Sequence, residues 1–141
     1  MNYVHEHLKN PAIVFKEVGR VLKPGGMFIS WVPNAISPSG LVIRILPFPL
    51  KKFLKKIIVG KEDPDVFPTY YRANTCSKLD KMLQRENFQR IYLEMVNGTG
   101  YLSKWRWGWY MHMLYVKICN NQYFNRFKSQ IFVVYMKRTK K

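Results

Sequence analysis

The chain has 141 residues, 48% of them hydrophobic, with 24 lysines and arginines against 8 acidic residues. This length suits one domain, and the hydrophobic fraction excludes a chain that is disordered throughout. The net charge of +16 favours contact with anionic material, such as phospholipid headgroups, nucleic acid or a phosphorylated substrate.

The first elements that the sequence predicts are a helix, a turn and a strand. Asn10 and Pro11 suit a helix start, because Asn can cap free N–H groups and Pro fits the first helical position. The apolar residues that follow recur at helical spacing: Val14, Val18, Val21 and Leu22. Residues 24–26, Pro-Gly-Gly, end the helix, and the apolar run "MFISWV" at 27–32 predicts a parallel strand buried on both faces.

A second periodic segment, "PLKKFLKKII" at 49–58, predicts a helix with one apolar face. The opposite face carries four lysines: Lys51, Lys52, Lys55 and Lys56. Two interpretations stay open. The helix is either a lid packed on its own domain or an element that lies in a membrane interface. Trp105, Trp107 and Trp109 favour the second, because tryptophan is enriched at such interfaces.

The remaining elements follow a loop at 61–75. Residues 77–86 predict a helix, with Ser77 and Asp80 resembling a capping box and Asn87 in the left-handed position after it. Alternating apolar residues at 91–95 predict a half-buried strand. Residues 105–128 show helical spacing that Gly108 weakens, and "QIFVVYM" at 130–136 predicts a strong strand.

The stretch "VHEHLKNPAIVFKEVGRVLKPGGMFISWVPN" resembles the second half of class I S-adenosylmethionine-dependent methyltransferases. In that family an "EH" pair follows the fourth strand, a helix ends in "RVLKPGG", and the fifth strand ends near Pro-Asn. The later "FPTYYRANT" and "LDKMLQRENF" resemble the loop, helix and sixth strand, and "QIFVVYM" would be the seventh, antiparallel strand. The resemblance implies an α/β fold with a partial Rossmann-like methyltransferase sheet, its last strand antiparallel, and helices packed on it.

The first half of that family carries a Gly-rich loop that approaches the cofactor and an acidic residue that holds its ribose. Neither is present in this sequence. We therefore expect residues 1–141 to be the C-terminal portion of a methyltransferase domain, with a basic lid-like insertion at about 44–62. Such a piece would begin at the end of the fourth strand and bind S-adenosylmethionine poorly alone. The missing N-terminal half is then a candidate partner.

The resemblance also implies site residues in the first segment. Asn2 and Tyr3 would lie near the cofactor, and Glu6 and His7 nearer the substrate. His7 is the candidate general base, because imidazole exchanges a proton near neutral pH. The alternative is that His7 only orients the loop. A metal site involving these residues is not expected, because no third ligand with suitable spacing is apparent.

Two later segments supply further candidates for substrate binding. Asn34 follows the fifth strand, and its side chain either bonds a substrate or makes an Asx turn. Tyr71 and Arg72 lie in the loop that resembles a substrate-side loop, where together they could hold an anionic or planar substrate. The alternative is a surface loop whose aromatic rings pack on the sheet.

The function that these patterns imply is S-adenosylmethionine-dependent methyl transfer to a small-molecule or lipid-linked acceptor. A non-catalytic membrane-surface or partner-binding module is the alternative. Nucleic acid is the least favoured partner, because no RNP, KH or helix-turn-helix signature is present. Two cysteines without a CxxC pair, and no apolar signal region, indicate a reducing, cytoplasmic location, with membrane association as an option.

Overall fold

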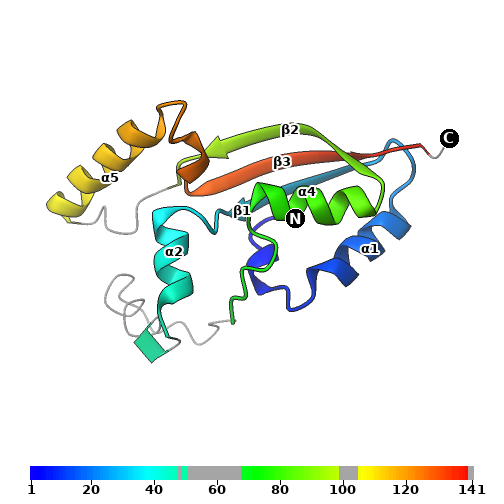
Figure 1. The fold of residues 1–141 in the computed structure, drawn as a ribbon, viewed down its shortest axis with the longest axis horizontal. Helices are drawn as coiled ribbons and strands as arrows, with labels where there is room; N and C mark the ends of the chain where they lie inside the picture. The colour runs from blue at the N-terminus through cyan, green and yellow to red at the C-terminus, as the bar shows by residue number, and fades with distance from the viewer. Residues whose placement is uncertain (48, 51–67, 99–104, 140–141) are drawn as a thin grey trace.

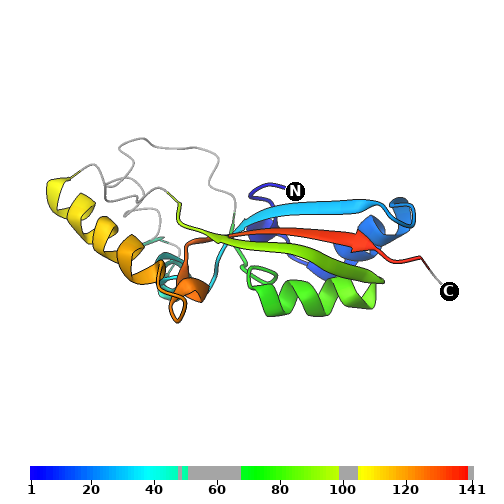
Figure 2. The same cartoon turned by 90° about the horizontal axis from the view of Figure 1, so that it is seen from above.

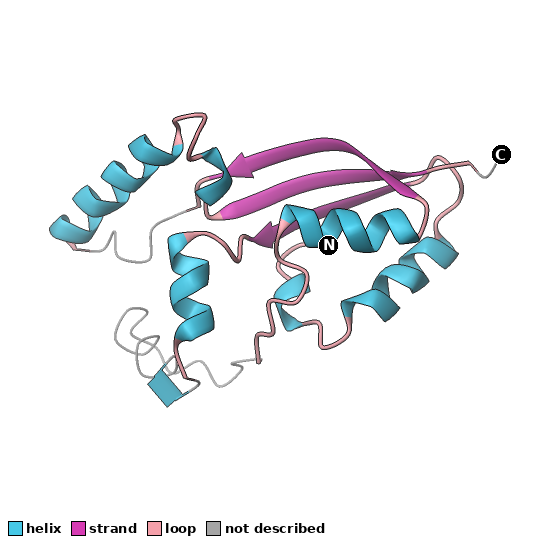
Figure 3. Ribbon diagram, in the orientation of Figure 1, coloured by secondary structure: helices cyan, strands magenta, loops and turns pink. Residues whose placement is uncertain are grey.

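The computed structural model describes residues 1–47, 49–50, 68–98 and 105–139. Figure 1 shows its helices and strands, and Figure 3 separates them by type. In chain order they are η1 (His5–His7), α1 (Pro11–Val21), β1 (Met27–Pro33), α2 (Pro38–Ile45), α4 (Cys76–Arg85), β2 (Phe88–Val96), α5 (Arg106–Cys119), η2 (Asn125–Phe127) and β3 (Gln130–Lys137).

The described strands form one sheet in the order β1-β3-β2, with β3 antiparallel to both neighbours. β1 and β2 therefore run parallel to each other, although they never pair. The sheet with helices packed on it and an antiparallel last strand agrees with the predicted α/β fold class. It also confirms the prediction that "QIFVVYM" is the strand that reverses direction.

The N-terminal residues lie along the outer edge of β1. Asn2 forms an isolated parallel bridge with Trp31. The Tyr3 N–H donates to the Trp31 carbonyl oxygen, and the Trp31 N–H donates to the Met1 carbonyl oxygen, each at 2.9 Å. This pairing carries the chain into η1 at the carboxyl end of β1.

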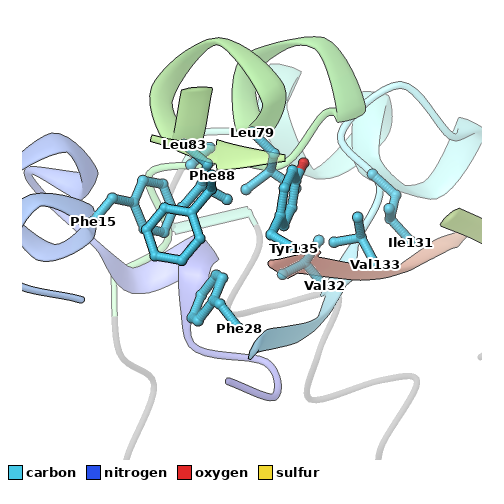
Figure 4. Close-up of a cluster of buried hydrophobic side chains, with 10 residues drawn as sticks. Phe15, Phe28, Val32, Leu79, Leu83, Phe88, Ile131, Val133 and Tyr135 are labelled. Carbon is cyan, nitrogen blue, oxygen red and sulfur yellow. The ribbon is translucent and has the colours of Figure 1, made fainter. Parts of the chain in front are cut away.

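The core lies between the sheet and two helices, α1 and α4, which cover the same face (Figure 2). Side chains from both helices and all three described strands fill it (Figure 4). Its largest fully buried members are Tyr135, Phe15, Phe88, Leu79, Leu83 and Ile131. Burial of each such side chain stabilises the fold by about 1.5–3 kcal/mol relative to its exposure.

The prediction that β1 is buried on both faces is wrong for the residues that the structure describes. Burial alternates along the strand: Phe28, Ser30 and Val32 are buried, whereas Met27 and Ile29 are exposed. An apolar run has no alternation that would show which face lacks a cover. The described helices α1 and α4 supply cover on only one side of the sheet.

The helix ends differ from their predictions in detail. Asn10 stands at the N-cap of α1 but makes no side-chain cap hydrogen bond. Thr75, and not Ser77, caps α4, because its Oγ1 accepts the Lys78 N–H at 3.3 Å. Asn87 has a φ of 62°, which confirms the predicted left-handed residue after this helix.

Two other elements were incompletely predicted. α2 was not predicted, although Ser37 caps it through the Gly40 N–H at 3.1 Å and Pro38 occupies its first turn. α5 accounts for only part of the segment 105–128 and keeps Gly108 within it. The predicted helix with the four lysines lies outside the described residues, as does most of the predicted insertion.

Candidate functional site

The carboxyl ends of β1 and β2 lie at one edge of the sheet, because both strands pair antiparallel with β3. The bridge between Asn2 and Trp31 brings the N-terminal segment to the same edge, and η1 follows directly. Ligands of open α/β sheets bind outside the carboxyl ends of the strands. The candidate site therefore lies where η1, the end of β1 and the segment before α4 meet.

Two segments far apart in sequence, residues 5–9 and 68–72, are hydrogen-bonded together here, and we call the pair the clasp. The backbone N–H groups of Tyr70 and Tyr71 donate to the Glu6 carbonyl oxygen at 2.6 and 3.3 Å. Arg72 Nη1 donates to the Lys9 carbonyl oxygen at 2.8 Å. The clasp contains four of the predicted site residues: Glu6, His7, Tyr71 and Arg72.

His5 attaches the clasp to the buried face of the sheet. Its ring is fully buried beside Phe15 and Phe28, and its Nε2 lies 2.7 Å from Ser30 Oγ on β1. Burial lowers the pKa of His5 to about 4, because the imidazolium would lose its hydration. His5 is therefore a neutral structural residue, and it positions the two residues that follow it.

Glu6 is almost completely buried, at 5% exposure. Its Oε2 is shielded from solvent and has no hydrogen-bond partner within the described part of the chain. Burial raises the pKa of this carboxyl, while the neighbouring His7 opposes the shift. A carboxyl in this state can hold a proton or donate a hydrogen bond at a higher pH than an exposed one, which is a property common to functional sites.

His7 is exposed, and its Nδ1 lies 3.1 Å from the Pro68 carbonyl oxygen. A carbonyl oxygen only accepts hydrogen bonds, so Nδ1 is the donor in this contact, and the contact orients the ring. The catalytic role of His7 itself stays a prediction.

Two tyrosines near the site have left-handed backbones. Tyr3 has a φ of 49° and Tyr71 a φ of 50°. Such a conformation costs a residue with a side chain about 1–3 kcal/mol and tends to occur at functional sites. The Tyr3 hydroxyl also accepts a hydrogen bond from Gln130 Nε2, so Tyr3 is anchored to β3. Asn2 is exposed beside it, and the cofactor contacts of both residues stay predictions.

Asn34 has a structural role. It is fully buried, and its Nδ2 donates to the carbonyl oxygens of Arg126 and Lys128 at 2.9 and 2.7 Å. Its Oδ1 accepts the Ile36 N–H at 3.2 Å, which is the Asx turn that the sequence allowed. Because the side chain is enclosed and bonded on both sides, we exclude it from the proposed substrate contacts.

Tyr71 and Arg72 differ in their surroundings. Tyr71 is 8% exposed, so its ring belongs to the protein interior, whereas Arg72 is exposed. The Arg72 guanidinium lies 5.8 Å from the centroid of the Tyr70 ring, which is itself 39% exposed. Tyr70 was not among the predicted site residues. Its position directly before Tyr71 in "PTYYR" was the available signal.

The described residues do not form a cofactor cradle. Gly25 and Gly26 lie at the amino end of β1, on the opposite edge of the sheet. Gly98 follows β2 at the site edge, but its N–H is committed to Ser129 Oγ at 2.6 Å. Gly40 packs against the Asn34 backbone, with no space for a side chain.

Metal binding and membrane crossing are likewise without support within the part of the chain that the structure describes. No group of three or more His, Cys, Asp or Glu side chains there could hold a metal ion. None of the helices there is long and apolar enough to pass through a bilayer.

A sequence match and a structural match with known proteins both support the resemblance to methyltransferases. Residues 1–30 match a family described as "Methyltransferase domain". The fold is similar to a crystal structure described as "a putative methyltransferase" from Bacillus halodurans C-125, with a TM-score of 0.51 and 16% identity over 98% of this chain and 68% of that one. A comparison with curated protein sequences finds no match. The chain thus resembles methyltransferases in sequence over its first 30 residues, and its fold is similar to that of this one solved structure.

Proposed function

We propose that this chain supplies the acceptor side of a methyl transfer from S-adenosylmethionine to a small-molecule or lipid-like acceptor. The observation that supports the proposal best is the clasp, because it assembles the "EH" turn and the later loop at the ligand-binding edge of the sheet. When bound, the cofactor would supply an activated methyl group. Binding and orienting the acceptor would be the work of the chain's own residues.

Within this proposal the clasp residues have distinct roles. His7 takes a proton from the acceptor on Nε2, while the Pro68 carbonyl oxygen holds the ring through Nδ1. Glu6 stays a predicted contact of the acceptor, and its backbone carbonyl oxygen joins the two segments of the clasp. Arg72, backed by the Tyr70 ring, attracts a negatively charged part of the acceptor.

We also propose that the cofactor cradle is formed by residues other than those described. A glycine loop lets the backbone approach a cofactor closely. Of the glycines described here, Gly40 packs on the Asn34 backbone and Gly98 donates its N–H to Ser129, so neither is available for such a loop. The chain by itself should then bind S-adenosylmethionine only weakly.

Calorimetry tests the weak-binding prediction directly. S-adenosylmethionine is titrated into the chain alone and into a longer polypeptide that joins it to a segment carrying the glycine-rich loop. We expect saturable micromolar binding by the longer polypeptide only. Micromolar binding by the chain alone would contradict the proposed division. Binding by neither would contradict the methyltransferase assignment itself.

The role of His7 is tested in the polypeptide that binds cofactor. Transfer of a labelled methyl group is measured into an extract of lipids and small molecules, with His7→Ala compared with His112→Ala. Loss of a general base typically slows the reaction by a factor of about 10²–10⁴. We expect that loss for His7→Ala, with cofactor binding unchanged, and none for His112→Ala. Equal rates in the two variants would assign His7 to orienting the loop instead.

The alternative function, a membrane-surface or partner-binding module, stays a prediction in its original form. The four lysines on which it rested lie outside the described residues. Membrane contact through α5 shares Trp105, Trp107 and Trp109 with this alternative but does not use the four lysines.

A further inference from the structure

α5 stands away from the sheet and is joined to the body along one side (Figures 1 and 2). On that side the Tyr115 hydroxyl donates to the Phe127 carbonyl oxygen at 2.7 Å, and Cys119 is buried at 2% exposure. Gly108 and His112, which precede these two residues at helical spacing, are partly covered. The attached side of α5 is therefore defined, and the remaining surface faces outward.

The outward surface of α5 is apolar. Residues at positions i, i+4, i+7 and i+11 form a stripe that we call the α5 stripe: Trp107, Met111, Leu114 and Ile118. Their exposed fractions are 84%, 64%, 52% and 46%. At about 100° per residue these four side chains share one side of the helix. A contiguous exposed apolar surface of this kind marks an interaction site.

Aromatic side chains surround the α5 stripe. Trp105 and Trp109 are 50% and 47% exposed, and Tyr110 is 57% exposed. After the helix, Tyr123 is 74% exposed. Tryptophan and tyrosine gather at the boundary between lipid headgroups and acyl chains, because their rings are apolar and their N–H or O–H groups remain hydrated.

Charge decides what can cover this surface. From Met95 to Lys141 the sequence has no Asp or Glu and nine Lys or Arg. Arg106 and Lys117 are exposed and project from the same flank of the stripe, since they are eleven residues apart. A second copy of the chain would bring together two molecules of net charge +16, which repel each other. An anionic lipid surface instead complements both the apolar stripe and its basic flank.

We propose that α5 binds the surface of an anionic phospholipid bilayer, with the α5 stripe in the headgroup–acyl boundary and Arg106 and Lys117 among the headgroups. At a rise of 1.5 Å per residue, α5 is too short to cross the bilayer. It would therefore lie in the membrane plane. The proposal is independent of methyl transfer, and it does not use the lysines at 51–56.

The test uses the full chain and vesicles of two compositions, phosphatidylcholine alone and phosphatidylcholine mixed with phosphatidylglycerol. Binding is measured by co-sedimentation and by tryptophan emission. Three of the four tryptophans in the chain, Trp105, Trp107 and Trp109, lie at α5 and report on it. We expect binding and a blue shift with the anionic vesicles, a steep loss with salt, and little binding to the neutral ones.

Matched variants locate the contact. Met111→Gln with Leu114→Gln interrupts the stripe, and Ile13→Gln, at a 60% exposed position of α1, is its control. Arg106→Gln with Lys117→Gln removes two charges from α5, and Lys16→Gln with Lys23→Gln removes two from exposed positions elsewhere.

Each basic residue near an anionic surface contributes roughly fivefold to affinity, so the α5 charge variant should bind at least about tenfold more weakly. The stripe variant should lose binding to a similar degree, and both controls should stay within about twofold of the parent chain. Circular dichroism establishes that each variant keeps its helices.

Three results would overturn the proposal. Equal binding to neutral and anionic vesicles would remove the role of charge. Equal loss in the α5 and control charge variants would show attraction by net charge alone. Self-association in ultracentrifugation without lipid, abolished by the stripe variant, would identify a second copy as the occupant.

Discussion

Two histidines separated by one residue have different environments in this protein. His5 is enclosed by aromatic rings and bonded to Ser30, whereas His7 is exposed above it. The short helix η1 produces the difference, because it turns successive side chains in different directions. Identical residue types therefore have a structural role at one position and a proposed chemical role at the other.

The buried His5 predicts that the protein loses stability in mild acid. Its pKa falls from 6.5 to about 4 on folding, so the unfolded state binds the extra proton between these values. The free energy of unfolding then decreases as the pH falls through that window, by about 3 kcal/mol at pH 4 relative to neutral. Urea unfolding at a series of pH values measures this slope.

His5→Gln should remove this contribution to the slope, and His112→Gln should keep it. Glu6 acts in the opposite direction, because its raised pKa means that the folded state loses stability as the pH rises above about 4.5. That contribution is common to the parent and the variants, so the difference between them isolates His5. An unchanged slope in His5→Gln would show that the imidazole is hydrated.

At the scale of elements, Asn34 joins the end of β1 to the segment that leads into β3. Its amide donates to two backbone carbonyl oxygens more than 90 residues away in sequence. Those carbonyls belong to η2 and the residue after it, so they have no strand partner of their own. One side chain thus fixes where η2 sits relative to the site edge.

Asn34→Ala should lower the free energy of unfolding by about 2–4 kcal/mol, because two carbonyl oxygens lose their donors in a buried place. Asn121→Ala is the matched control. Its exposed side chain accepts one hydrogen bond, from the Tyr123 N–H at 3.1 Å, and its loss should cost less than about 1 kcal/mol. Urea midpoints give both values, and similar losses would mean that the Asn34 bonds contribute little.

The sequence predicted elements better than it predicted their surroundings. α1, α4 and β3 follow from periodicity and turn residues that act locally. The antiparallel direction of β3 came from the family resemblance, whereas its position between β1 and β2 was not predicted, because no local pattern encodes strand order. The enclosure of Asn34 and the exposure of one side of β1 depend on residues distant in sequence, so they could not be read from either segment.

In the candidate site, too, the segments were predicted but the surroundings of their side chains were not. The resemblance assigned the "EH" pair and the loop at 68–72 separately to the substrate side, but it did not predict that hydrogen bonds join them. The sequence could not show that His5 turns inward and His7 outward, because this depends on contacts with Phe15, Phe28 and Ser30. The left-handed backbones of Tyr3 and Tyr71 were also hidden, since tyrosine has no preference for that conformation.

At the scale of the whole molecule, the described residues give the sheet one packed face and one open face. The open face carries Met27, Ile29 and Trp31 from β1, which are 60%, 49% and 37% exposed. The Trp31 and Phe132 rings meet edge to face on it, with centroids 5.7 Å apart. Exposed apolar surface of this kind promotes association when the protein is concentrated.

Ile29→Lys should therefore reduce aggregation, because a charge on the open face opposes its contact with another apolar surface. Val21→Lys is the control: it adds the same charge at a 67% exposed position at the end of α1. Light scattering during concentration should fall for Ile29→Lys only. An equal fall in both variants would attribute solubility to net charge.

The middle strand of the sheet is also the last to be synthesised. β1 and β2 flank β3 but precede it in the chain, so neither has its neighbour while the ribosome is still at work. At a translation rate of about 5–20 residues per second, β3 is synthesised several seconds after β1. During that interval the nascent chain displays two apolar strands to chaperones. A stop codon before Gln130 would leave both strands permanently without the partner that joins them.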